Sequence, residues 1–178
     1  KFFPNNTISL EDKIGYRGFD KSYFESLKGD VNALIKTTAG NIRVNLFGNH
    51  APQTVVNFID LSQQDYFTDK YFHRVVPNFV IQTGCPRGDG YGSEDFIIRS
   101  ELAPMRYEDA GYIGMASAGN HTEATQWFVT HSPTPHLNGR YSIFGKVVEG
   151  MDVVHKMQVG DQITSLEIIT VPLVEENN

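Results

Sequence analysis

The segment of this chain that says most about its fold is Phe72-His73-Arg74-Val75-Val76-Pro77-Asn78-Phe79-Val80-Ile81-Gln82. Aromatic and β-branched residues on both sides of Pro77-Asn78 predict two short strands joined by a turn. Side chains alternate between the two faces of a strand, so by parity Arg74 and Gln82 lie on one side, although the turn interrupts the count. A surface arginine whose stem packs on two core strands gives the same pattern.

The polar side chains of this stretch indicate a limited chemistry. Arg74 supplies a guanidinium, Gln82 a carboxamide and Phe79 a phenyl ring, with almost no other ionisable group nearby. Such a set can hold an amide through hydrogen bonds and apolar contact, but it includes no evident nucleophile.

Length and composition limit the class of protein and the kinds of partner and site that the chain can have. The 178 residues fit one domain whose hydrophobic core is large enough to be stable without disulfides or a structural metal. A net charge of −6 predicts no nucleic-acid partner and no anionic membrane surface. The single cysteine, Cys85, excludes an internal disulfide and a cysteine-based zinc site. No apolar run approaches the ~18 residues of a membrane span.

The compartment stays unknown at this stage. A soluble protein is expected, either cytoplasmic or extracytoplasmic, for example periplasmic. The chain opens on Lys1 rather than on methionine, so removal of a leader or of an upstream domain stays open.

The chain divides into an N-terminal extension or linker, residues 1–30, and a main domain, residues 31–174. In the extension, residues 20–29 predict a short helix with Asp20 as N-cap and Gly29 just past its end. In the main domain the spacing of apolar residues predicts a single all-β domain of about eight strands with two helices. The helices are expected from Pro52 to Ser62 and from Met151 to Met157. The strands are expected at 33–38, 42–47, 71–76, 79–83, 96–99, 112–116, 126–131, 141–148 and 165–171. The stretch from Gly84 to Asp95 is expected to be a long surface loop.

Other chemistries find little support in the sequence. The six histidines show no metal-ligand spacing, so no metal site is predicted. Ser117 lacks the glycine that a nucleophile elbow needs two positions earlier. A carboxylate-based hydrolase would need Asp95 and Glu101 to converge in a cleft, and that alternative stays open.

Two later blocks complete the pattern. In GMASAGNHTEATQWFVT, residues 114–130, the small residues at 116–119 allow a ligand close to the backbone, and Gln126 and Phe128 share one face of a strand. In HLNGRYSIFGKV, residues 136–147, Asn138-Gly139 predicts a tight turn.

The three blocks, in this order and at these separations, resemble the cyclophilin family of peptidyl-prolyl cis/trans isomerases. The similarity runs from about Val31 to Val171. It implies a closed eight-stranded antiparallel β-barrel with an α-helix over each end. It also implies rotation about X-Pro bonds in protein folding without a covalent step, metal or cofactor.

The resemblance assigns the site residues by matching position. It implies Arg74, Phe79 and Gln82 as catalytic, with the guanidinium near the prolyl nitrogen. The implied substrate-binding residues are Val80, Met115, Ala116, Ser117, Ala118, Gln126, Phe128, His136, Leu137 and Tyr141. Among these, Phe79, Val80, Phe128 and Leu137 form the proline pocket with Met115 just beneath, and Ala116 and Ala118 line a groove for residues before the proline.

Departures from the family pattern refine these expectations. Ser117 stands where asparagine is usual, and Tyr141 replaces a frequent histidine, as in many bacterial members. His136 replaces a tryptophan associated with tight cyclosporin binding, so weak cyclosporin binding is expected. The loop from Gly88 to Ser93, at the nearby side of the groove, also lacks the glycine-rich sequence that is usual in the family.

The expected partners are proline-containing peptides and unfolded proteins, bound by a monomer. A module that binds proline-containing segments, or a chaperone without significant turnover, is the alternative from another functional class.

Overall fold

The computed structural model describes residues 15–18, 20–26 and 30–171; residues 1–14, 19 and 27–29 of the predicted extension and 172–174 of the predicted domain lie outside these ranges. The elements in chain order are β1 (Gly15–Tyr16), α1 (Lys21–Ser26), β2 (Asp30–Thr37), β3 (Gly40–Leu46), α2 (Pro52–Gln63), β4 (Arg74–Val76), β5 (Val80–Thr83), β6 (Phe96–Ile97), β7 (Tyr112–Met115), β8 (Trp127–Thr130), a 3-10 helix (Pro135–Leu137), β9 (Ile143–Glu149), α3 (Met151–Lys156) and β10 (Ile163–Val171).

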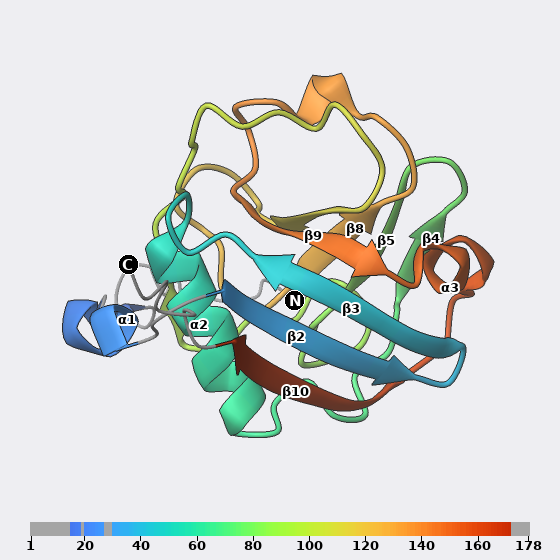
Figure 1. Ribbon diagram of the computed structural model, residues 1–178, viewed down its shortest axis with the longest axis horizontal. Helices are drawn as coiled ribbons and strands as arrows, with labels where there is room; N and C mark the ends of the chain where they lie inside the picture. Colours follow the sequence, from blue (N-terminus) through green and yellow to red (C-terminus); the bar gives the residue numbers. More distant parts are fainter. Residues whose placement is uncertain (1–14, 19, 27–29, 172–178) are drawn as a thin grey trace, which may run out of the picture.

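Eight of the strands form one curled antiparallel sheet in the order β10-β2-β3-β9-β7-β8-β5-β4. Figure 1 shows α2 across one end of the curled sheet and α3 near the other end. The predicted mainly-β fold with a helix at each of these places is therefore confirmed.

The expected closed barrel needs correction, because hydrogen bonds do not close the sheet. Within the described residues the edge strands β4 and β10 do not pair with each other. An isolated bridge between Tyr71 and Gln162 lies just outside them, and the Phe72 amide donates to the Asp161 carbonyl oxygen over 2.8 Å. The reason is that β4 has only three residues and turns directly into its hairpin with β5. The result is a curled half-barrel with a seam.

Alternation in β3 builds one wall of the core. Ile42, Val44 and Leu46 are 1%, 0% and 5% exposed, and they alternate with partly or fully exposed residues, as the sequence predicts. The core they face is rich in aromatic rings. Trp127 lies at its centre, with its ring centroid 5.8 Å from that of Phe58. Burial of these apolar side chains is the main favourable contribution to folding.

Helix α2 begins without a cap from its own sequence neighbourhood. Pro52 occupies the first turn, and Ala51 offers no side-chain acceptor for the free amides. Glu101 supplies the acceptors instead: its carboxylate accepts the Gln53 amide over 3.0 Å, and the Thr54 amide and hydroxyl over 2.8 and 2.7 Å. A carboxylate at this end also complements the helix dipole. Residue 101 is thus fixed to the start of a distant helix.

The strand expected at 96–99 is present as β6 but lies outside the curled sheet. It pairs in parallel with β1, in register Gly15 to Phe96 and Tyr16 to Ile97. The described part of the extension also reaches α2. Arg17 forms an ion pair with Asp60 and donates to the Asn57 side chain over 2.9 Å. The backbone partner of β6 is therefore the N-terminal segment rather than the curled sheet.

Candidate active site

A row of residues crosses four strands of the sheet at one level. Arg74 on β4 lies directly opposite Gln82 on β5, Gln82 lies opposite Phe128 on β8, and Phe128 lies opposite Gly114 on β7. Directly opposed residues in antiparallel strands project from the same face. The sheet thus places a guanidinium, a carboxamide and a phenyl ring side by side, and the prediction that Arg74 and Gln82 share a face is confirmed.

Arg74 is held loosely at the edge of this row. Its Nη1 donates to Gln82 Oε1 over 3.4 Å, and its Cζ lies 5.5 Å from the centre of the Phe79 ring. The side chain is exposed. The turn before Phe79 allows this arrangement, because Asn78 adopts a left-handed conformation with φ of 60°. A charged, solvent-facing group therefore sits above an apolar floor.

These side chains open onto a cavity of about 270 Å³, which we call the strand cavity. All of its lining residues belong to the set predicted from the sequence. They are Arg74, Phe79, Val80, Gln82, Ala116, Ser117, Phe128, Leu137 and Tyr141.

Two unpredicted residues determine the position of the Phe128 ring at the floor of the strand cavity. Tyr107, which is fully buried, stacks on Phe128 with centroids 5.9 Å apart. Gly114 leaves the space for both, because a Cβ at this position would lie 2.2 Å from the Tyr107 hydroxyl and 2.5 Å from Phe128 Cζ. Tyr141 closes the other side with an edge-on contact at 5.7 Å. Tyr107 was not predicted, because it lies in an irregular segment without periodicity.

The remaining predicted residues lie around the strand cavity rather than in its lining. His136 stacks on the outer face of Phe79 with centroids 5.3 Å apart. Met115 is 1% exposed, packs in the main core and lines neither cavity described here. Gln126 and Ala118 line a second cavity.

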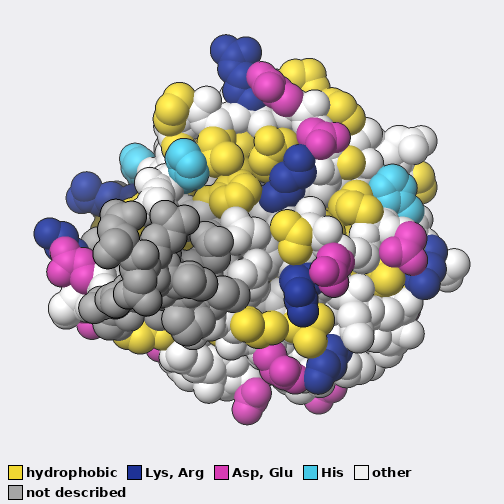
Figure 2. All heavy atoms as spheres, in the orientation of Figure 1, with side chains coloured by type: hydrophobic (Ala, Val, Ile, Leu, Met, Phe, Trp, Pro, Cys, Tyr) yellow, Lys and Arg dark blue, Asp and Glu magenta, His cyan; other side chains and the backbone are white. Residues whose placement is uncertain are grey.

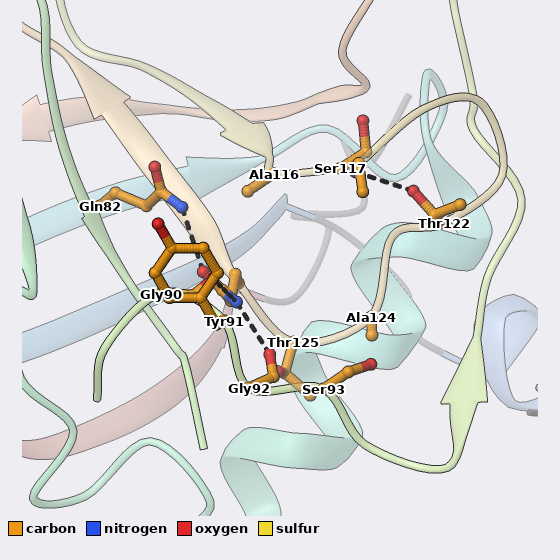
Figure 3. Close-up of a pocket in the computed structure, with 12 residues that line it drawn as sticks. Gln82, Gly90, Tyr91, Gly92, Ser93, Ala116, Ser117, Thr122, Ala124 and Thr125 are labelled. Atoms are coloured by element: carbon orange, nitrogen blue, oxygen red, sulfur yellow. Dashed lines mark hydrogen bonds between the residues drawn. The ribbon is translucent and has the colours of Figure 1, made fainter. Parts of the chain in front are cut away.

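This second cavity, of about 310 Å³, adjoins the first, and we call it the loop cavity. The two share Gln82, Ala116 and Ser117. Figure 3 shows how Gly90, Tyr91 and Gly92 face the segment that carries Ala116, Ser117 and Thr122. The rest of the lining comes from Ser93, Ala118, Ala124, Thr125 and Gln126. Residues 90–93 were predicted only as part of a surface loop, since glycines give no side-chain signal of a wall.

The ionisable groups near the cavities are few. Burial raises the pKa of Tyr107, so its hydroxyl stays protonated. Burial lowers the pKa of His73, which lies next to Gly90 under the loop. Neither Asp95 nor Glu101 lines either cavity, and Glu101 caps α2. The hydrolase alternative therefore lacks its carboxylate pair. Over the described ranges, no three His, Cys, Asp or Glu side chains gather as a metal site would require.

Comparison with known proteins decides the family. The family model described as "Cyclophilin type peptidyl-prolyl cis-trans isomerase/CLD" matches residues 33–173. The chain belongs to the cyclophilins. The activity of this cyclophilin is peptidyl-prolyl cis/trans isomerisation, and the predicted family is confirmed.

Relatives of this cyclophilin include bacterial proteins. It is 41% identical over 140 residues to a peptidyl-prolyl cis-trans isomerase of Synechococcus elongatus, an alignment that covers 78% of this chain and 96% of the relative. It is 40% identical over 146 residues to a peptidyl-prolyl cis-trans isomerase of Helicobacter pylori, over 80% and 89% of the two chains. A crystal structure of a cyclophilin type isomerase from Cryptosporidium parvum superimposes with a TM-score of 0.76 at 30% identity, over 80% of this chain and 99% of that one.

The surface of this cyclophilin mixes both signs of charge. On the face in Figure 2, Lys and Arg side chains lie among Asp and Glu side chains rather than in a patch of one sign. Among the described helices, none has the length and apolar character needed to cross a membrane.

Proposed function

We propose that Arg74 is the catalytic cation for X-Pro rotation in this isomerase. Rotation is slow because resonance ties the prolyl nitrogen lone pair to the carbonyl, with a barrier of ~18–20 kcal/mol. As the bond twists, the lone pair localises on nitrogen, and a donor near that nitrogen stabilises the twisted state more than the planar one. The exposed guanidinium 5.5 Å above the Phe79 ring is the observation that carries this proposal. It stays charged at every relevant pH.

The strand cavity would hold the proline ring. Val80, Phe128 and Leu137 are 2%, 5% and 8% exposed, so the floor offered to the ring is apolar and already buried before a ligand arrives. Gln82 lies beside it, with one end of its carboxamide toward Arg74. A floor built on two strands and a 3-10 helix needs little rearrangement on binding, which favours the twisted amide by preorganisation.

Proline-containing peptides and unfolded proteins are the proposed substrates. The Cryptosporidium parvum isomerase was also solved in the presence of the dipeptide Ala-Pro, and that structure superimposes with a TM-score of 0.75. The loop cavity adjoins the strand cavity through Ala116 and Ser117, so residues before the proline would extend toward Ala118 and Gln126.

Replacement of the guanidinium tests the proposal directly. We expect Arg74→Ala to lower kcat/KM for a proline peptide at least about tenfold, because it removes the donor at the twisting bond. Arg74→Lys, the matched control, keeps the charge without the rigid fork and should lie between the alanine variant and the wild type. A protease-coupled peptide assay measures the rates, and thermal unfolding shows whether each variant keeps its fold.

Exchange spectroscopy separates this isomerase from a module that only binds. With a proline peptide and a substoichiometric amount of protein, the wild type should give NMR exchange cross-peaks between cis and trans forms. A chain that shifts the peptide peaks without cross-peaks would be a binder, and an Arg74→Ala variant with wild-type rates would remove Arg74 from the mechanism.

Cyclosporin should bind weakly. His136 packs its ring on Phe79, so this position presents a small, exposed imidazole rather than a large indole with its N–H donor. We expect His136→Trp to strengthen binding while leaving isomerisation close to wild type. Calorimetric titration measures the affinity, and a sub-micromolar dissociation constant for the wild type would overturn this expectation.

The division of the chain into an extension and an isomerase domain also remains a proposal. Support comes from where the described part of the extension lies: Arg17 contacts α2 through Asp60 and Asn57, and no described residue before 31 lines either cavity. The segment would then stabilise the domain from outside the site.

A further inference from the structure

The orientation of one carboxamide links the loop cavity to the guanidinium. Gln126 Nε2 lies 3.1 Å from the Gly90 carbonyl oxygen and 3.0 Å from the Gly92 carbonyl oxygen. Backbone carbonyls only accept hydrogen bonds, so the NH2 end of Gln126 must face the loop. Its Oε1 is therefore turned toward Gln82.

The same logic orients the next carboxamide. Gln82 Nε2 donates to Gln126 Oε1 over 3.1 Å, which leaves Gln82 Oε1 facing Arg74 Nη1 at 3.4 Å. A reversed amide at either glutamine would place donor against donor, since a guanidinium has no acceptor. The two loop carbonyls thus decide that Arg74 meets an oxygen rather than an NH2 group.

The loop that carries these carbonyls is itself held by a buried sulfur. Cys85 is 1% exposed, and its Sγ accepts the Gly90 and Gly92 amides, each over 3.3 Å. On the outer side, Asp89 accepts the Tyr91 amide over 2.9 Å and pairs with Arg87 at 2.6 Å. The amides of Gly90 and Gly92 therefore donate to the Cys85 sulfur, and the carbonyl oxygens of the same two glycines accept from Gln126.

We infer that the Cys85–Gly92 loop is a positioning element for Arg74, with Cys85 as its anchor and Gln126 as its link to the site. Cys85 lines neither cavity. It acts through the loop carbonyls, the two carboxamides and finally the guanidinium, and so it is a positioning residue rather than a catalytic one. The inference rests on the catalytic role proposed for Arg74.

Removal of the sulfur tests the anchor. We expect Cys85→Ala to lower kcat about tenfold with KM nearly unchanged, because small misplacements of a reacting group cost that much. Cys85→Ser returns an acceptor and should recover most of the loss. Val154→Ala, also fully buried but on α3, should lower the unfolding temperature without a change in kcat.

Removal of the NH2 group of Gln126 tests the link between the loop and the site. In Gln126→Glu the carboxylate can still accept from Gln82 Nε2 but has no proton to donate to the Gly90 and Gly92 carbonyls, so the side-chain volume is kept while the link to the loop is lost. We expect kcat to fall, and the side-chain amide signals of Gln82 and the Nε–H signal of Arg74 to move in nitrogen-detected NMR spectra. These NMR shifts are also expected in Cys85→Ala and not in Val154→Ala.

The outcomes separate the two proposals. If Cys85→Ala and Gln126→Glu keep wild-type kcat and NMR signals while Arg74→Ala loses activity, the positioning inference fails and the proposed function stands. If Arg74→Ala keeps its activity, both fail. If Val154→Ala loses as much kcat as Cys85→Ala, the loss in Cys85→Ala arises from lower overall stability, and the inference is also overturned.

Discussion

The strand cavity and the loop cavity adjoin but are built differently. The first has at its centre side chains of strands, such as Val80 and Phe128, which are held by the register of the sheet. The second takes much of its wall from the backbone of Gly90 and Gly92, which is held by Cys85 and Gln126. Strand register resists displacement because every residue pairs, whereas a loop depends on a few contacts. We therefore expect the chemistry to take place in the first region, with the loop backbone acting on it only through Arg74, and substrate preference to depend on the side chains of the second region.

A methyl group at Gly114 would disturb the strand cavity most. We expect Gly114→Ala to destabilise the protein by about 1–3 kcal/mol through overpacking against Tyr107 and Phe128. It should also lower kcat/KM at least about tenfold by displacing the proline floor. Gly15→Ala is the control, because nothing lies within 4 Å of a Cβ there. Unfolding curves and the peptide assay measure both effects, and wild-type activity in Gly114→Ala would show that the floor tolerates movement.

Acidification should destabilise the protein near both regions, because a histidine with a lowered pKa lies close to each of them. Burial lowers the pKa of His73 beneath the loop, and burial together with the neighbouring His155 lowers the pKa of His131, whose amide donates to the Phe79 carbonyl. The unfolded chain then binds protons at higher pH than the folded chain. Stability should therefore fall as the pH drops below 6.5, the ordinary value, toward the lowered folded values.

Single variants assign that pH dependence to a region. His131→Gln should flatten the slope that arises near the strand cavity, and His73→Gln the slope that arises beneath the loop. Urea unfolding at pH 7.5, 6.5 and 5.5 gives the slopes. An unchanged slope in both variants would exclude these two histidines as its source.

The smallest effect is expected at Tyr91, which lines the loop cavity but is 87% exposed. Tyr91→Ala should change stability by less than about 0.5 kcal/mol. It should change the order of rates among peptides that differ in the residues before proline. Tyr16→Ala, an exposed tyrosine that lines neither cavity, is the control. An unchanged order of rates in Tyr91→Ala would contradict a role for this wall in substrate preference.

The same contrast explains how far the sequence predicts the molecule. Alternation in β3 and helical spacing in α2 predicted which residues are buried, because burial of one face is a local pattern. The three blocks, residues 72–82, 114–130 and 136–147, contain every residue that lines the strand cavity. The pairing of β6 with β1 was not predicted, because two-residue strands carry no periodicity. Contacts such as Tyr107 on Phe128 and Cys85 on Gly92 join distant or irregular segments, and single-sequence patterns do not report them.

The cap that Glu101 gives to α2 has a consequence for biosynthesis. Glu101, which caps the first turn of this helix, lies 47 positions after Thr54 and 48 after Gln53. While residue 101 is still inside the ribosomal exit tunnel, helix α2 would lack this cap, and its first turn would be expected to fray. The first turn of α2 should become fully ordered only after residue 101 has emerged from the ribosome. Nascent chains that have not reached this point should therefore resist proteases less well than the complete chain.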